Sequence, residues 1–467
     1  MLAGGGKRED DDRGVGGRRT LVSGRFNRFA SEVAGTFATR VCLFAAGVAG
    51  SVLIARALGP EGKGVLAAVL LVPNTLIIVG MFGVGTATTY LIGRGCQLGY
   101  IVRRLSRIGL VLGAAYLVSA LAGFLLGREV LFSQASIAAF ALAALVCPMG
   151  LWLRYAEYVF LGTGDIRLRN VALVAQGVAQ IVLLVFLLLW PLGLGVEGAI
   201  LGRLLSTIVA LGLAVFWIRG LLRERRQETT VERFAPMPAA SSGLLWFGFR
   251  AYASTVVMFL NYRADLLMLR AFRSDAEVGI YSVSVGLAEL LWYLPGAFGM
   301  VLLSRAARST SEGLGARSTR LMLALSLLIA GVVAVVAPWA IGILYGRAYA
   351  GSVEPLRILL AGVVAVTIFK ILNPDLAGRG RPGAGSLVFL GALAVNLGLN
   401  ALWIPLWGAT GAAWASTVSY ALGSTVFLGV YSRITSTPLR DLVVLRSGDL
   451  RDAGEWLKRI AKKGAGR

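Results

Sequence analysis

The chain is dominated by long apolar segments, each about as long as an α-helix that crosses a lipid bilayer. Roughly 20 apolar residues span the hydrocarbon core, and the sequence contains twelve such segments. They lie at 33–55, 65–91, 108–127, 134–153, 170–191, 197–218, 243–262, 278–303, 320–344, 354–373, 384–404 and 409–431. In lipid a helix satisfies all its own backbone hydrogen bonds, so these segments predict an all-α polytopic membrane protein with twelve transmembrane helices.

Composition and charge agree with this prediction. The chain is 57% hydrophobic and only 15% charged, with a mean hydropathy of +0.75, whereas soluble domains carry about 25% charged residues. The net charge of +22 would suggest nucleic acid in a soluble protein. Here 17 Lys and Arg lie in the loops on one side and 8 on the other, even without the two tails. Lys and Arg gather on the cytoplasmic side, so we expect both termini in the cytoplasm, membrane lipids as partners and no nucleic acid.

The charged segments divide the chain into five parts. The first is Gly-rich and charged, the third is basic, and the fifth places Trp456 and Ile460 among Lys and Arg, as in an amphipathic surface helix. A dimer contact is the alternative for this last part. The predicted parts are a disordered cytoplasmic N-tail (1–30), an N-terminal six-helix bundle (31–218), a basic cytoplasmic linker (219–241), a C-terminal six-helix bundle (242–432) and an amphipathic basic C-tail (433–467).

Several classes of chemistry are disfavoured by composition. The chain has no histidine, which removes imidazole acid–base catalysis and Ser-His-Asp triads. Its three cysteines have neither paired nor Cys-x-x-Cys spacing, so we expect no metal site and no disulfide framework. The predicted outer loops are short and hold no paired carboxylates, which argues against a membrane glycosyltransferase or ligase. We expect no catalytic residues and no cofactor.

The two halves of the sequence repeat each other. Their matching residues recur in the same order and at nearly the same offset, which favours a true repeat over chance similarity between Gly-rich helices. Each half has six spans, so both halves enter the membrane in the same direction and form a parallel repeat, an architecture typical of rocking transporters. The matches are Trp190, Gly195, Gly198 and Ala199 with Trp403, Gly408, Gly411 and Ala412 at offset 213, Gly64 with Gly279 at 215, and Gly162 and Gly164 with Gly378 and Gly380 at 216.

Three stretches resemble a known family. "IARALGPEGKGVLAAVLLVPNTLIIVGMFGVGTATTYLIG" (54–93), "RADLLMLRAFRSDAEVGIYSVSVGLAELL" (263–291) and "VNLGLNALWIPLWGATGAAWASTVSY" (395–420) are similar to polysaccharide-export flippases, the Wzx-type proteins of the MOP (MATE-like) superfamily. The resemblance covers residues 30 to 432. It implies a MATE-like fold of two six-helix bundles in the bacterial inner membrane. It also implies movement of undecaprenyl-pyrophosphate-linked oligosaccharide to the outer leaflet for polysaccharide biosynthesis, with polysaccharide polymerase machinery as an expected partner.

Basic residues inside the spans are the first candidates for substrate binding. An arginine at a helix centre costs about 2.5 to 3.5 kcal/mol, so it usually faces a wet cavity or a partner. Arg40 lies about 12 Å beyond Glu32 along its helix, and Arg250 lies at similar depth in the first helix of the second half. Planar guanidinium groups suit a pyrophosphate, so these two arginines are predicted to line one cavity. Arg203 and Lys370 are further candidates, and snorkelling to the headgroups is the alternative for all four.

Two acidic residues are candidates for coupling to a gradient of H⁺ or Na⁺. Glu289 falls midway between the charges that bracket its span. A carboxylate at that depth either pairs with an arginine or titrates as a coupling site. Asp265 lies beside Arg263 near the end of its span, where an ordinary boundary ion pair is the stronger interpretation.

Three functional hypotheses follow besides the enzyme. The first is a flippase for lipid-linked oligosaccharide that works by alternating access. The second is a MATE-type cation or drug exporter, which would call for buried carboxylates, whereas this sequence places more arginines than acids deep in its spans. The third is a scaffold that transports nothing. The sequence names neither the sugar nor the coupling ion.

Overall fold

The computed structural model describes residues 12–81, 83–93, 95–131, 136–189, 192–228, 241–306, 313–379, 381, 383–446 and 448–449. All regular structure in these ranges is helical, as predicted. The first six helices are α1 (Asp12–Gly80), α2 (Val84–Gly93), α3 (Leu98–Leu131), α4 (Ile137–Thr163), α5 (Ile166–Leu184, extended by the π-turn η1, Val185–Leu189) and α6 (Gly195–Glu228). The second half contains α7 (Ser241–Phe272), α8 (Asp275–Glu289), η2 (Leu290–Trp292), α9 (Tyr293–Ala306), α10 (Leu314–Leu344), η3 (Arg347–Ser352), α11 (Val353–Gly378), α12 (Ala384–Thr435) and α13 (Leu439–Val443).

The two longest helices are hairpins: α12 contains two predicted spans, and α1 contains one and most of the next, which continues into α2. α1 reverses at Gly59 (φ 65°) and α12 at Gly408 (φ 57°), positive values that a residue without a Cβ adopts at little cost. In each hairpin, side chains of the two legs form hydrogen bonds with each other. Lys63 donates to the Ser51 hydroxyl at 2.8 Å, and Asn396 donates to the Ser419 hydroxyl at 3.1 Å. The predicted break between spans is therefore a tight reversal in both places.

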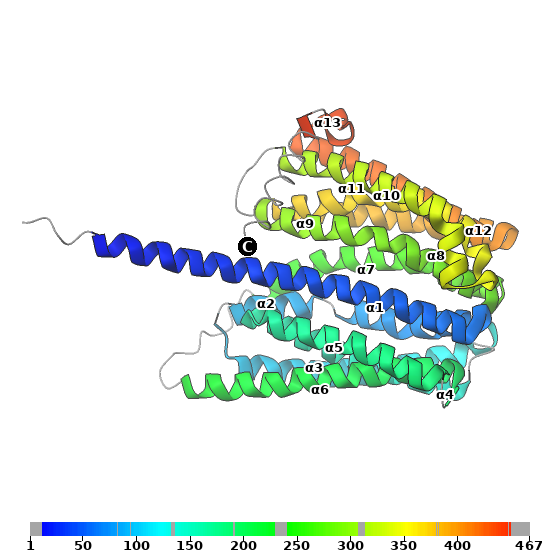
Figure 1. The fold of residues 1–467 in the computed structure, drawn as a ribbon, viewed down its shortest axis with the longest axis horizontal. Helices are drawn as coiled ribbons and strands as arrows, with labels where there is room; N and C mark the ends of the chain where they lie inside the picture. The colour runs from blue at the N-terminus through cyan, green and yellow to red at the C-terminus, as the bar shows by residue number, and fades with distance from the viewer. Residues whose placement is uncertain are drawn as a thin grey trace, which may run out of the picture.

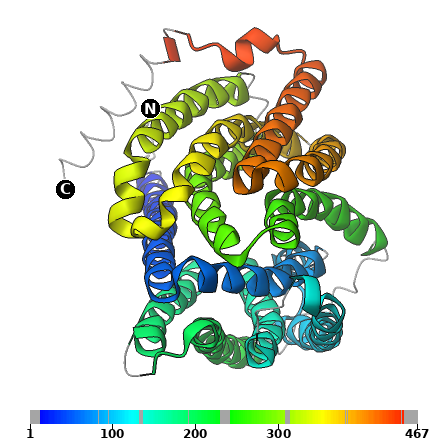
Figure 2. The same cartoon turned by 90° about the vertical axis from the view of Figure 1, so that its right-hand side faces the viewer.

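Within the described residues, nine helices are long and apolar enough to cross a membrane. Two of the nine are the hairpins α1 and α12, and the seventh predicted span falls on α7. Two predicted spans are divided between helices: 65–91 between α1 and α2, and 278–303 between α8 and α9. Figure 1 shows α2 to α6 on one side of the first leg of α1, and α7 to α13 on the other. Figure 2, which faces the end where α1 and α12 reverse, shows the same two groups of helices end-on. The chain is a multi-pass membrane protein built from two helical bundles.

The sequence repeat is visible in the contacts. Gly198 presses against the carbonyl of Leu187 on the preceding helix, and its counterpart Gly411 presses against the carbonyl of Trp403. A Cβ added to these glycines would lie 3.1 and 2.3 Å from the respective oxygens. Both halves thus use glycine for the same close approach of two helices, at the offset of 213 found in the sequence.

Some predicted boundaries differ from the structure. α1 begins at Asp12, so the prediction of a disordered tail is wrong for residues 12–30. Apolar Val22, Phe26 and Phe29 recur at helical spacing between arginines, and extending an existing helix needs no new nucleus. α6 continues to Glu228 inside the predicted linker. The rest of that linker (229–240) and the predicted amphipathic helix around Trp456 lie outside the described residues.

The segment after α12 is fastened to α10. Arg320 donates to both carboxylate oxygens of Asp449, at 2.6 and 2.7 Å, and both side chains are buried. Leu442 of α13 is buried in the core of the C-terminal bundle. The hydrogen bonds from Arg320 lower the pKa of Asp449 below its ordinary value. The ionised carboxylate therefore stabilises the docked segment.

We expect this segment to loosen in acid. The contribution of Asp449 is complete above the ordinary aspartate pKa of about 3.9 and is lost as pH falls through the lower pKa of the folded state. Amide hydrogen exchange of residues 439–446, corrected for intrinsic rates, should accelerate below about pH 4. Asp449→Asn should reduce protection about tenfold at neutral pH and remove the acid step. An acid step that persists in Asp449→Asn would contradict this assignment.

Candidate functional site

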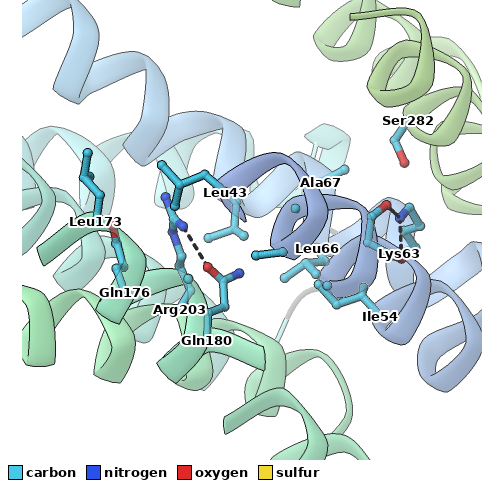
Figure 3. A pocket seen from close by; sticks show the side chains of 16 residues that line it. Leu43, Ile54, Lys63, Leu66, Ala67, Leu173, Gln176, Gln180, Arg203 and Ser282 are labelled. Atoms are coloured by element: carbon cyan, nitrogen blue, oxygen red, sulfur yellow. Dashed lines mark hydrogen bonds between the residues drawn. The ribbon is translucent and has the colours of Figure 1, made fainter. Parts of the chain in front are cut away.

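A cavity of about 390 Å³ lies in the N-terminal bundle, between both legs of α1, α5 and α6. Figure 3 shows Arg203 and Gln180 on one side of it and Lys63 on the other. Ser282 of α8 closes it from the C-terminal bundle. The lining residues are Leu43, Ala46, Gly47, Gly50, Ser51, Ile54, Lys63, Leu66, Ala67, Leu70, Leu173, Gln176, Gly177, Gln180, Arg203 and Ser282.

Polar groups enter this cavity from one face of each helix. Gln176 and Gln180 stand one turn apart on α5, and Arg203 on α6 donates to the Gln180 side-chain oxygen at 2.9 Å. Gln176 donates to the Thr207 hydroxyl at 3.1 Å. The Gln180 amide therefore holds the guanidinium at the wall of the cavity, and no carboxylate among the described lining residues compensates its charge.

Lys63 occupies the opposite wall. The residue is 7% exposed, and its ammonium group is held by Ser51, with the carbonyl oxygen at 3.1 Å and the hydroxyl at 2.8 Å. It also lies 5.5 Å from the centre of the Tyr345 ring, a cation–π contact. All three partners are neutral.

The charge balance of the cavity is its most informative property. Among the lining residues that the structure describes, two are cations and none is a carboxylate. A charge removed from bulk water costs several kcal/mol unless an opposite charge compensates it. The cavity is therefore built to hold an anion and to repel a cation.

A second group of charges lies next to the cavity, one turn further along the same helices. Glu157 on α4 accepts from Arg154 at 2.9 Å and from Arg169 at 3.3 Å. Arg40 is close enough to Arg169 for the two positive charges to repel each other. Arg40 precedes the lining residue Leu43 by one turn on α1, and Arg169 precedes Leu173 by one turn on α5. Positive charge thus continues from the cavity along the seam between α1 and α5.

The C-terminal bundle pairs its charges. Arg263 binds Glu289 through two hydrogen bonds of 2.6 and 3.0 Å. Lys370 on α11 lies 4.7 Å from the Trp292 ring and 5.4 Å from the Tyr262 ring. Of the two interpretations that the sequence left open for Glu289, the pairing with an arginine is the one present.

Asp265 is buried in a polar cluster deep in the C-terminal bundle. Its carboxylate is 1% exposed and accepts from the Tyr281 hydroxyl at 2.6 Å and the Ser416 hydroxyl at 2.9 Å. Asn261, one turn earlier, is fully buried with both side-chain polar atoms unpartnered. The interpretation of Asp265 as a boundary ion pair is wrong, because α7 extends to Phe272 and places Asp265 well inside the bundle.

The two bundles meet in a close backbone contact, which we call the junction (Pro60, Gly64, Asp275 and Gly279). A Cβ on Gly64 would lie 1.8 Å from the Asp275 carbonyl oxygen, and one on Gly279 would lie 1.9 Å from the Pro60 carbonyl oxygen. Both pairs are related by the repeat offset of 215. The junction is therefore a pseudo-two-fold contact that only glycine permits.

Tyrosines extend the junction at the same end of the molecule. Tyr349 of η3 donates to the Ala55 carbonyl at 3.1 Å, and the hydroxyl groups of Tyr345 and Ser51 are 3.3 Å apart. Arg56 donates to the carbonyls of Leu344, at 2.7 Å, and Ile343 at the end of α10. These contacts hold α1 against the C-terminal bundle.

The predicted substrate residues have different outcomes. Arg203 lines the cavity, Arg40 lies one turn from it, and Lys370 lies in the other bundle. The side chain of Arg250 lies outside the described residues, so its predicted pairing with Arg40 stays a prediction. Sequence reasoning missed Lys63, because it lies between two predicted spans and was counted as a loop residue.

The glutamines were also missed, although the sequence carried a signal for them. Gln176 and Gln180 stand four residues apart in an otherwise apolar span. That spacing places two amides on one face of the helix, which is typical of a polar wall inside a bundle.

Comparisons with known proteins agree on the fold. The sequence matches no family profile and no curated protein. A multidrug resistance MATE family transporter of the MOP superfamily, in an inward-facing conformation, is similar with a TM-score of 0.69 and 18% identity over 85% of this chain and 95% of that one. The lipid II flippase MurJ, in an inward closed conformation, is similar with a TM-score of 0.67 and 12% identity over 88% and 89%.

A multidrug resistance MATE family transporter in an outward-facing conformation is similar with a TM-score of 0.58 and 16% identity, over 86% of this chain and 96% of that chain. At these identities the comparisons speak for the fold alone. The chain has the all-helical fold of MOP superfamily transporters.

Proposed function

We propose that the protein is a transporter that flips undecaprenyl-pyrophosphate-linked oligosaccharide across the bacterial inner membrane by alternating access. The single observation that carries this proposal is the cavity in which Lys63 and Arg203 meet no carboxylate. The negative charge of a pyrophosphate would compensate these two cations. The prenyl tail would remain in the lipid while the headgroup travels through the protein.

The conformation supports the same reading. With both termini in the cytoplasm, as the loop charges predict, the junction lies on the outer side and is shut. The chain also superimposes better on an inward-facing MATE structure than on an outward-facing one. A headgroup would then enter from the cytoplasm past Arg40, with Arg250 as a further proposed contact, and leave when the junction parts.

A MATE-type exporter of cations or drugs is the second candidate. Its support is the fold shared with multidrug resistance transporters. The charge of the cavity opposes it, because a cationic substrate would face both Lys63 and Arg203 without a carboxylate among the lining residues.

Transport is also proposed to draw on a gradient of H⁺ or Na⁺, with Asp265 and Glu289 as the candidate carboxylates. Asp265 is the stronger candidate, because neutral hydroxyl groups surround it, whereas Arg263 already neutralises Glu289. The unpartnered Asn261 amide adds an oxygen beside Asp265 that fits a cation.

Arg203→Met should reduce flipping of lipid-linked oligosaccharide at least tenfold, since a hydrogen bond to a charged group is worth about 1.5 to 3 kcal/mol. The measurement is the rate at which labelled lipid in proteoliposomes becomes accessible from the other leaflet. Arg203→Lys should retain part of the rate because it retains the charge. Arg223→Gln, an exposed arginine on the same helix, is the matched control. The proposal would be refuted if Arg203→Met flipped the lipid at the wild-type rate. It would also be refuted if the protein exported a cationic dye and Arg203→Met increased that export.

A further inference from the structure

Lys63 lines the cavity and is also adjacent to the junction. Its side chain lines the cavity, and the next residue, Gly64, lies at the junction against the Asp275 carbonyl. The other cation among the described lining residues, Arg203, donates to Gln180 of its own bundle and lies on the opposite wall from the junction. A ligand that binds the Lys63 ammonium group therefore lies next to the contact between the two bundles.

The partners of Lys63 form one cluster that crosses between the bundles. Ser51 accepts two hydrogen bonds from the ammonium group. The Tyr345 ring faces the ammonium group, and the Tyr345 hydroxyl bonds Ser51. Tyr345 directly follows α10 in the C-terminal bundle, so the positive charge of Lys63 helps to hold that bundle against α1.

All of these contacts are weaker than the one that an anion would offer. A hydroxyl group, a carbonyl and an aromatic face are neutral, whereas a charge-assisted bond to a phosphate oxygen is shorter and roughly twice as strong. The cavity volume of about 390 Å³ lies in the range of small-ligand sites, about 300 to 1,000 Å³. Arg203 lines one wall and Lys63 the other (Figure 3), so an anion that enters the cavity is attracted by two cations.

We propose that Lys63 and Arg203 bind a pyrophosphate-class oxyanion in the cavity, and that binding draws Lys63 away from Ser51 and Tyr345 and so releases the junction. The inference rests on the proposed function and adds the trigger for its outward step. An empty cavity leaves Lys63 on the tyrosine and the outer side shut. An occupied one uses the same ammonium group for the ligand, and the two bundles lose a contact that held them together.

The test measures the width of the junction with and without inorganic pyrophosphate. Spin labels are placed at Glu61 and Ala348, exposed positions on either side of the junction, after replacement of Cys42, Cys96 and Cys147. Pyrophosphate should lengthen the distance between the labels in the purified wild-type protein. Lys63→Met removes the same contact with Tyr345, so the distance should already be long without ligand. It should also bind pyrophosphate at least tenfold more weakly and show no further lengthening at saturation. Lys63→Arg should restore part of both responses.

Two variants separate a trigger from a merely structural contact. Tyr345→Leu removes the ring that receives the ammonium group, so the distance should already be long without ligand while pyrophosphate binding is retained. Tyr349→Phe removes a junction hydrogen bond that does not involve Lys63, so it should keep the response to pyrophosphate. Lengthening in Lys63→Met like that of the wild type would overturn the inference.

The source of the anion is tested with a short-chain prenyl pyrophosphate. Lengthening at lower concentration than with inorganic pyrophosphate would assign the site to a lipid headgroup, and equal concentrations would assign it to a free anion. Both results support the trigger at Lys63. Wild-type protein that binds pyrophosphate without any change in distance would overturn the trigger but leave the proposed function intact. Wild-type protein that binds neither compound would overturn both.

Discussion

Gly64→Ala is expected to abolish transport while the protein remains folded and inserted in the membrane. The added methyl group would lie 1.8 Å from the Asp275 carbonyl oxygen, a backbone atom that cannot rotate away. The two bundles would have to move apart at the junction, although each bundle keeps its own core. Overpacking typically costs about 1 to 3 kcal/mol, which corresponds to a shift of about 10- to 100-fold from the closed to the parted state. Gly279→Ala should act in the same way, because its methyl group would meet the Pro60 carbonyl oxygen.

The distance between spin labels at Glu61 and Ala348, together with flipping in proteoliposomes, measures both effects. Gly286→Ala is the matched control, since Gly286 also lies on α8 and a Cβ there would meet nothing within 4 Å. It should leave both measurements unchanged. Gly64→Ala that transports at the wild-type rate would mean that the junction does not have to close during the cycle.

The junction shows how far the sequence determines the fold. Gly64 and Gly279 align at the repeat offset, and the repeat predicts equivalent positions in two bundles. Apolar length and loop charge located the spans, because both follow from transfer of side chains into lipid. The contact between the two equivalent glycines could not be predicted. A repeat offset identifies equivalent positions, but it does not say how close those positions lie to the pseudo-two-fold axis.

The sequence predicted one cation of the candidate site and missed the other. Arg203 was found because a charge inside a long apolar span is conspicuous. Lys63 was not, since it follows the reversal at Gly59 and resembles a loop residue. The folding of α1 into a hairpin brings it back beside Ser51, a contact that depends on the packing of two legs and has no local signature. Asp265 was assigned to the membrane boundary because the helix that contains it is longer than the apolar segment that predicted it.

Asp265→Asn should remove the dependence of transport on an ion or proton gradient. The carboxylate is buried among hydroxyl groups, and the amide that replaces it preserves shape but cannot gain or lose a charge. A bound H⁺ or Na⁺ neutralises the carboxylate and removes the cost of a buried charge, so the cluster differs in energy between its loaded and empty states. Flipping in proteoliposomes under an imposed Na⁺ gradient, and separately under a pH gradient, identifies the ion. We expect the gradient to accelerate the wild type several-fold and Asp265→Asn not at all.

Glu289→Gln is the variant with which the gradient response of Asp265→Asn is compared. Glu289 is a second deep carboxylate, but Arg263 binds it through two hydrogen bonds, so its charge is already balanced. Removing it should leave Arg263 unpaired and lower the amount of folded protein, since breaking such a pair leaves an uncompensated charge. The protein that does insert should still respond to the gradient. A gradient response lost in Glu289→Gln and kept in Asp265→Asn would transfer the coupling role to the ion pair. In that case the arginine would have to release its carboxylate during each cycle, and Arg263→Lys should then alter the ion dependence as well.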